Sequence, residues 1–218
     1  MNPHFIYNML SVISAASIEG ENEKVTELCC QLSRLLRYAA SKGNQFATLQ
    51  GEVDYALCYC KLMQARYEDK LKYDFSVEGE LNKIQVPKLI IQPLIENAII
   101  HGLSSLSEGG LIYVRGFKKD DKMWLSIADT GVGIEKDKLD SIRKYLDNIF
   151  ALPDTETAAS SKNDSNYADS EINRKTVGVG IGNIAYRVKG MYNNSGMKIY
   201  SRKNHGTVIQ IYFGNNSK

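Results

Sequence analysis

Apolar residues in the N-terminal third of the chain recur three and four positions apart. Val25, Leu28, Leu32, Leu35 and Ala39 follow this spacing, which predicts a helix that packs on another helix. After a break at residues 41–44, the same spacing returns at Leu49, Val53, Ala56, Cys60, Met63 and Tyr67. The two segments predict an antiparallel helical hairpin. Since such a hairpin is too thin to cover its own apolar seams, we expect a symmetric homodimer that closes a four-helix bundle.

From about residue 69 onward the pattern changes to short strands and helices. We expect strands at residues 71–77, 111–118, 122–129, 198–201 and 207–213, and helices at residues 87–101, 138–150 and 178–192, the last opening on a glycine-rich turn. Residues 153–175 are polar, with few large apolar side chains, and predict a mobile loop. The fold class is therefore α+β, with a helical hairpin followed by an α/β sandwich.

Composition and charge exclude only a few classes of partner and site. The chain has 218 residues and a formal net charge of +2, with no run of like charges that would suggest a nucleic-acid partner. Its four cysteines, Cys29, Cys30, Cys58 and Cys60, lack zinc-site spacing and are predicted to be buried, reduced thiols on helices. No segment has the pattern of a targeting peptide or a membrane span, so we expect an intracellular chain.

The first candidate motif is NPHFIYN, at residues 2–8. The spacing of His4 and Asn8 places the imidazole and the amide on one face of a helix. The alternative is that Asn2 caps the helix, Pro3 opens it, and His4 is an ordinary surface residue.

The second motif, LIIQPLIENAIIHG at residues 89–102, places Glu96, Asn97 and His101 in an otherwise apolar helix. A buried helix has little reason to carry a carboxylate beside an amide unless both face a ligand. Asn97 and His101 share a face, and an amide oxygen there could complete the octahedral shell of a phosphate-bound Mg²⁺. The alternative is that these polar residues merely form the solvent-exposed face of an amphipathic helix.

Two glycine motifs follow. In WLSIADTGVGI, residues 124–134, Asp129 ends a strand and, by the alternation of side chains along it, points to the face that we expect to be the inner one. Gly131 and Gly133 would let the backbone approach a ligand such as an adenine base. In TVGVGIGNIAYRV, residues 176–188, Gly178, Gly180 and Gly182 precede a helix whose N-terminal amides favour phosphate. Turn geometry for the first motif and a flexible hinge for the second are the alternatives.

Taken in order, these motifs resemble those of sensor histidine kinases of the LytS/YehU type, with the N, G1 and G2 boxes of the GHKL superfamily (gyrase, Hsp90, histidine kinase and MutL). The resemblance covers nearly the whole chain. It implies a dimerisation and histidine phosphotransfer domain at residues 1–68 and a catalytic ATP-binding domain at residues 69–218, with a mobile ATP lid at about 135–177. It further implies the cofactors ATP and Mg²⁺ and a response-regulator receiver domain as partner.

The resemblance also assigns roles to single residues. His4 looks like the phosphoacceptor, Asn8 its polar neighbour, and Glu96 the acidic residue proposed as a base or polarising group. Asn97 looks like the Mg²⁺ ligand and Asp129 the contact to the adenine amino group. The remaining nucleotide-binding positions are His101, Gly131, Gly133, Gly178, Gly180 and Gly182.

Two positions depart from common patterns of the family. Phe5 follows the acceptor histidine where many histidine kinases have Glu or Asp, as it does in the LytS-like group, and Ile100 stands where the N box often has Lys or Arg. A catalytically weak, phosphatase-biased or scaffold member is therefore one alternative, and a serine-directed or hydrolytic GHKL protein is another. Because the motif begins near residue 1, we expect a cytoplasmic fragment of a protein that is anchored in the cell membrane through its N-terminal part.

Overall fold

The computed structural model describes residues 3–41, 45–104, 106–151, 179–192 and 194–214. Gly178 and the predicted mobile loop at residues 153–175 lie outside these described residues. None of the helices described is long and apolar enough to cross a bilayer.

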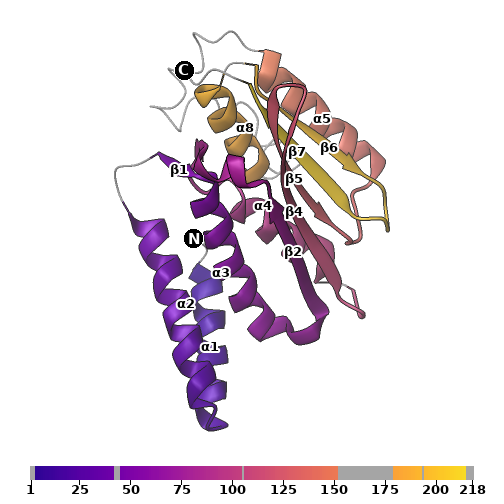
Figure 1. The fold of residues 1–218 in the computed structure, drawn as a ribbon. Helices are drawn as coiled ribbons and strands as arrows, with labels where there is room; N and C mark the ends of the chain where they lie inside the picture. Colours follow the sequence, from indigo (N-terminus) through magenta and orange to yellow (C-terminus); the bar gives the residue numbers. More distant parts are fainter. Residues whose placement is uncertain (1–2, 42–44, 105, 152–178, 193, 215–218) are drawn as a thin grey trace.

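Three helices form the N-terminal part, which extends away from the sheet on one side of the molecule (Figure 1). They are α1 (Pro3–Ile18), α2 (Asn22–Ala40) and α3 (Leu49–Tyr67). Thr48 caps α3, since its Oγ1 accepts the N–H of Gly51 at 3.1 Å. The predicted hairpin of α2 and α3 is confirmed, and α1 packs against both of its helices.

The predicted seam of the hairpin is buried within one chain. Leu28, Leu32 and Leu35 of α2 are buried, and so are Phe5 and Met9 of α1. The third helix therefore supplies the cover that we expected from a second protomer. A dimer contact would therefore use side chains that remain exposed in one chain.

A five-stranded sheet forms the centre of the described C-terminal part, in the order β2-β4-β5-β7-β6. Its strands are β2 (Leu71–Val77), β4 (Gly110–Lys119), β5 (Lys122–Asp129), β6 (Gly196–Ser201) and β7 (Thr207–Phe213). The pair β2–β4 is parallel and the other neighbours are antiparallel. A second, two-stranded sheet pairs β1 (Phe46–Thr48) with β3 (Gln85–Pro87). All five strands predicted from the sequence are present.

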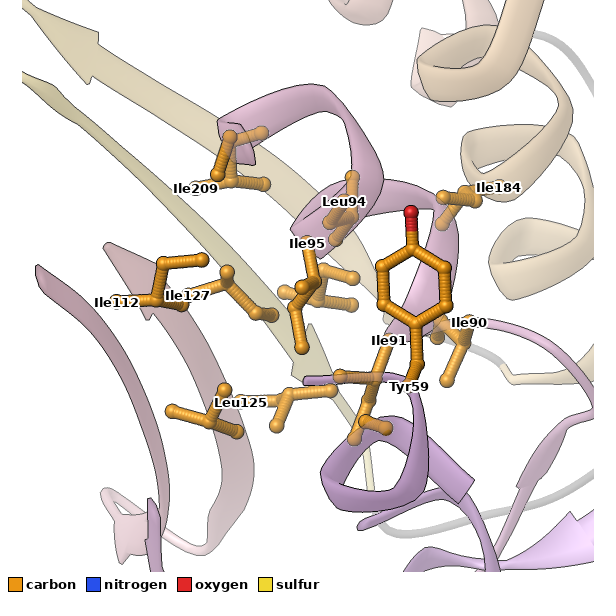
Figure 2. Close-up of a cluster of buried hydrophobic side chains, with 14 of the residues drawn as sticks. Tyr59, Ile90, Ile91, Leu94, Ile95, Ile112, Leu125, Ile127, Ile184 and Ile209 are labelled. Carbon is orange, nitrogen blue, oxygen red and sulfur yellow. The ribbon is translucent and has the colours of Figure 1, made fainter. Parts of the chain in front are cut away.

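The core lies between this sheet and the helices α4 (Gln92–Asn97), α5 (Lys136–Ala151) and α8 (Val179–Met191). Short 3₁₀ segments, η1 (Glu68–Lys70) and η2 (Gly79–Lys83), flank β2. In Figure 2, Leu125 and Ile127 of β5 point toward Ile95 of α4, and Tyr59 of α3 belongs to the same buried cluster as Ile184 of α8. The long helix α3 packs against β2 and α4 as well as against α1 and α2, and residue 68, the predicted domain boundary, follows directly after it.

The predicted helix at residues 87–101 is wrong at both ends. Val86 and Pro87 pair with β1, and Leu89 has a left-handed backbone (φ +60°), so the helix begins only at Gln92. From Ala98 to Leu103 it continues as a π-helix, η3. Apolar spacing alone could not reveal either feature, because a buried turn and a helix carry the same hydrophobic run.

Two further expectations need correction. Cys29 and Cys30 are exposed on α2, whereas Cys58 and Cys60 are buried as predicted, and burial raises the pKa of the Cys60 thiol to about 12. Residues 136–151 of the predicted lid form α5, whose apolar side chains are buried in the core. The lid prediction is thereby reduced to residues 152–177, which lie outside the described part of the chain.

Candidate functional site

The second motif forms a short helix that changes its winding at Asn97. Pro93 stands in the first turn of α4, where the absence of its N–H leaves no unmet intrahelical bond. Gln92 Nε2 donates to Glu96 Oε2 at 2.8 Å, which holds the Glu96 carboxylate along the helix. Asn97 is the last α-helical residue before η3. Since π-helical turns occur frequently at functional sites, the change of winding favours a ligand-binding role here.

Asp129 ends β5 with its carboxylate half-buried. It has the parity of Met123, Leu125 and Ile127, which are buried, as predicted from the strand alternation. Burial raises the pKa of Asp129, while hydrogen bonds from the backbone N–H groups of Gly131 and Thr207 lower it, with a net upward shift. The N–H of Gly131 donates to Oδ1 at 2.8 Å. The carboxylate is thus a fixed hydrogen-bond acceptor at the edge of the core.

Gly102 and Gly131 let two segments of the site touch through their backbones. The N–H of Val132 donates to Gly102 O at 3.0 Å. A Cβ on Gly131 would lie 2.5 Å from the Gly102 backbone, and a Cβ on Gly102 would lie 3.0 Å from Asp129 Oδ1. Gly102 is a site residue that sequence reasoning missed, although it ends the second motif. The only signal was a glycine directly after His101, at the end of that motif.

Gly133 serves the turn that follows. Its backbone is left-handed (φ +67°), and a Cβ there would overlap the carbonyl oxygen of Arg202. The close approach that the structure shows for Gly131 and Gly133 is therefore between protein segments. Their contact with a base remains a prediction.

Two of the three predicted phosphate-side glycines lie in the first turns of α8. A Cβ on Gly180 would be 3.7 Å from Asn97 Nδ2, so this turn lies beside the second motif. A Cβ on Gly182 would be 2.8 Å from Tyr145 Oη, so Gly182 allows α8 to pack on α5. The helix begins at Val179, one turn earlier than the glycine pattern suggested.

His4 lies in the first turn of α1 and is exposed. Asn8 Nδ2 is 3.2 Å from His4 Nδ1, which confirms that the two side chains share a face. Phe5 is 6% exposed, and its ring centroid lies 5.1 Å from that of Tyr59 on α3. The position after His4 is therefore part of the core, where an unpaired carboxylate would be costly. This burial explains why Phe5 replaces an acidic residue.

His101 and Ile100, on the π-helix, are exposed, Ile100 by 41%. The structure places Gly102 against Asp129 and Gly131, and Gly180 beside Asn97. The nucleotide-binding role of His101 remains a prediction.

These residues fit a nucleotide with a bound Mg²⁺. Asp129 offers an acceptor for an amino group, Asn97 offers an amide oxygen of the kind that Mg²⁺ accepts, and the first turn of α8 offers backbone amides to phosphate. Among the described residues no group of three or more His, Cys, Asp or Glu side chains could hold a metal ion. A Mg²⁺ here would therefore need the phosphate oxygens of the nucleotide as further ligands.

Two family models match the chain. The model described as "Histidine kinase" matches residues 1–71, and the model described as "Histidine kinase-, DNA gyrase B-, and HSP90-like ATPase" matches residues 82–216. The second match covers more than half of the chain and contains Asn97, Asp129 and Gly180. The first contains His4.

Curated relatives carry related names. The sensor histidine kinase BtsS of Escherichia coli is 31% identical over 129 residues, which is 59% of this chain and 23% of that protein. The sensor protein LytS of Staphylococcus saprophyticus is 35% identical over 145 residues, covering 66% of this chain and 24% of the relative. The chain thus spans about a quarter of the length of these relatives.

Solved structures of histidine kinases are similar at low sequence identity. The Acinetobacter baumannii histidine kinase AdeS gives a TM-score of 0.48 at 12% identity, covering 92% of this chain and 83% of that chain. The histidine kinase domain of a blue-light activated kinase from Erythrobacter litoralis gives 0.46 at 12% identity, covering 97% and 95%.

Proposed function

Because this chain belongs to the histidine kinase-, DNA gyrase B- and HSP90-like ATPases and its residues 1–71 match the histidine kinase model, we propose that it transfers the γ-phosphoryl group of ATP to His4. One observation carries the proposal. Three segments far apart in the sequence, the end of α4 with η3, the end of β5, and the start of α8, meet around Asn97, Asp129 and Gly180.

Each segment has its own task in binding ATP. The Asp129 carboxylate accepts a hydrogen bond from the amino group of adenine, and its own bonds from backbone N–H groups hold it in place. The amides in the first turn of α8 bind phosphate oxygens, because their N–H groups have no partner within the helix. Asn97 supplies an amide oxygen to Mg²⁺, which neutralises phosphate charge when bound.

His4 is the proposed acceptor. A neutral imidazole is nucleophilic without a strong base, because one ring nitrogen keeps its lone pair. One of its nitrogens attacks the γ-phosphorus, an N–P bond forms, the bond to the β,γ-bridging oxygen breaks, and ADP leaves, while the other ring nitrogen releases its proton to solvent. Asn8, 3.2 Å away, fixes the orientation of the ring. Glu96, held by Gln92, is the proposed polarising group.

The phosphoryl group would then pass to an aspartate of a response-regulator receiver domain, as in a two-component system. Phosphohistidine can donate in this way because its N–P bond is readily cleaved. The chain spans about a quarter of its curated relatives, which are sensor proteins. We propose that it works as the cytoplasmic part of a longer, membrane-anchored homodimer.

Labelling with γ-³²P-ATP and Mg²⁺ tests the proposal. We expect label on the wild type that acid removes and alkali leaves, and none on His4→Gln. The matched control is His205→Gln, which changes an exposed histidine in the turn between β6 and β7. Equal labelling of wild type and His4→Gln would contradict a role for His4 as acceptor.

A second candidate function rests on Ile100. An exposed apolar side chain stands where a cation would face phosphate, so transfer could be slow and dephosphorylation could dominate. In that case the protein binds ATP but acquires little label, and it accelerates loss of phosphate from a phosphorylated receiver domain. A receiver whose phosphate lifetime does not change when the protein is added contradicts this second candidate.

A further inference from the structure

A carboxylate outside the proposed site is buried against the segment that leads into it. Glu52, in the first turn of α3, has an exposed fraction of 0%. Its Oε1 accepts the N–H of Leu89 at 2.7 Å, and its Oε2 accepts the N–H groups of Ile90 at 2.7 Å and Ile91 at 3.3 Å. Three consecutive backbone amides thus converge on one carboxylate, as in an anion-binding backbone nest.

The segment that Glu52 binds has an unfavourable backbone. Leu89 is left-handed (φ +60°), a conformation that costs a residue with a Cβ free energy and persists only where its surroundings enforce it. Its N–H group is one of the three that Glu52 accepts. α4 begins directly afterwards at Gln92 and ends at Asn97. The carboxylate therefore fixes the point from which the Asn97 helix starts.

The same carboxylate is bonded to the end of α2. Tyr38 Oη donates to Glu52 Oε1 at 2.6 Å. Beside it, Lys88 Nζ donates to Ser41 Oγ at 2.6 Å and to Ser41 O at 3.0 Å, and lies 4.8 Å from the centre of the Tyr38 ring. The C-terminal end of α2 is thus joined to residues 88–91 by two independent routes.

We propose that Glu52 is a positioning residue that sets Asn97 for Mg²⁺·ATP, and that Tyr38 couples the end of α2 to it. The inference rests on the proposed function, because it assigns Asn97 to the metal. α4 has only six residues, fewer than two turns, so a shift at its first residue reaches Asn97 undiminished. A displacement of about 1 Å at a reacting group can lower a rate by about a hundredfold. Movement of α2 would reach the ATP site through this carboxylate.

Two variants separate the parts of the proposal. Glu52→Gln keeps the size of the side chain but leaves one oxygen where the carboxylate has two, and its amide group faces backbone donors. Tyr38→Phe keeps the ring and removes only the phenol O–H. Asp54→Asn, an exposed neutralisation on the same helix, and Tyr73→Phe, a phenol bonded to Gln64 Oε1, are the matched controls.

The decisive measurement is the ratio of ATP affinities with Mg²⁺ and with EDTA, by titration calorimetry on the whole chain. In Glu52→Gln we expect this ratio to fall about tenfold while the affinity in EDTA stays within about twofold, because adenine binding at Asp129 is spared. Tyr38→Phe should lower the ratio about threefold. The controls should match the wild type.

Amide hydrogen exchange without nucleotide gives the second readout. Exchange of the Leu89, Ile90 and Ile91 amides should rise about tenfold in Glu52→Gln, while the β5 and β7 amides stay protected. If Glu52→Gln loses ATP affinity equally with Mg²⁺ and with EDTA, the variant is generally destabilised and the positioning role is overturned. The positioning role is also overturned if neither affinity changes. A wild type that binds no ATP would overturn the proposed function itself, which is a different result. If Glu52→Gln does not fold, an unchanged ratio in Tyr38→Phe overturns the coupling.

Discussion

At the residue scale, Asp129 serves two opposing requirements. Burial raises the pKa of its carboxyl, so the folded chain binds a proton there more readily than the unfolded chain does. The adenine recognition that we propose for Asp129, in contrast, needs an acceptor with lone pairs free. Functional sites typically contain residues whose ligand-binding protonation state lowers the stability of the fold.

The sign of this linkage gives a stability prediction. With a raised folded-state pKa, the contribution of Asp129 to stability is present below its unfolded pKa and is lost as pH rises through the folded pKa. At pH 7 the ionised carboxylate therefore destabilises the fold. We expect the melting temperature of Asp129→Asn at pH 7, measured by circular dichroism, to equal or exceed that of the wild type. A clearly lower melting temperature would contradict this assignment of cause.

Ile100 gives a second prediction at this scale. Ile100→Lys places a cation at an exposed position of the π-helix, where the N box of the family often has Lys or Arg. Exposed charge pairs contribute about 0.2–1 kcal/mol, so we expect ATP affinity to rise by a factor of about 1.4 to 5, and the gain to shrink at high salt. Ile100→Met is the apolar control. If both variants bind ATP as the wild type does, Ile100 does not face phosphate.

Several site residues could be predicted from the sequence because their signals are local. His4 and Asn8 share a face through helix spacing, and Asp129 points inward through strand parity. Gly102 and Glu52 could not be predicted in this way. Each acts through a contact with a distant segment, Gly102 with Gly131 and Glu52 with residues 89–91. No periodicity encodes such contacts.

At the element scale, the strands were predicted well and the second motif poorly. Strands β2, β5 and β7 have the predicted limits, because alternation and turn residues mark both of their ends. The predicted helix at residues 87–101 merged a strand, a nest and two kinds of helix into one apolar run. The nest forms only because Glu52 supplies an anion from α3, which is a tertiary effect.

Helix α1 gives a prediction about docking. Phe5 is 6% exposed against Tyr59, and removing such a side chain costs about 3–5 kcal/mol. Because Phe5 lies in the first turn, part of this loss will appear as local undocking, so we expect Phe5→Ala to lower unfolding free energy by about 2–4 kcal/mol in urea. Phe46→Ala, at a phenylalanine that is 48% exposed, is the control and should cost less than about 1 kcal/mol. Equal effects would show that α1 is not anchored through Phe5.

At the scale of the whole molecule, α1 has two apolar faces. Phe5, Met9 and Ala16 are buried against α2 and α3. Tyr7, Leu10 and Ile18 are exposed, and at about 100° per residue they lie on the opposite side of the helix. The sequence predicted a dimer from the α2 and α3 seams, which the fold buries. We therefore now predict that the dimer forms through the exposed stripe of α1, which consists of Tyr7, Leu10 and Ile18.

Leu10→Asp tests the dimer. A charge in the centre of the exposed stripe should block association, because burying it without a partner is costly. We expect light scattering with size exclusion to show a dimer for the wild type and a monomer for Leu10→Asp, with the same helix content. Tyr200→Asp, at an exposed tyrosine of β6, is the control and should remain dimeric. A dimeric Leu10→Asp protein would exclude this face.

The measurement that tests the central claim most directly is ATP binding by wild type and Asp129→Asn in Mg²⁺, by titration calorimetry. A hydrogen bond to a charged group contributes about 1.5–3 kcal/mol, so the account predicts that the wild type binds ATP and that Asp129→Asn binds it about 10- to 100-fold more weakly, with an undiminished melting temperature. Equal affinities, or a wild type that binds no ATP, would contradict the claim that Asn97, Asp129 and Gly180 form a nucleotide site.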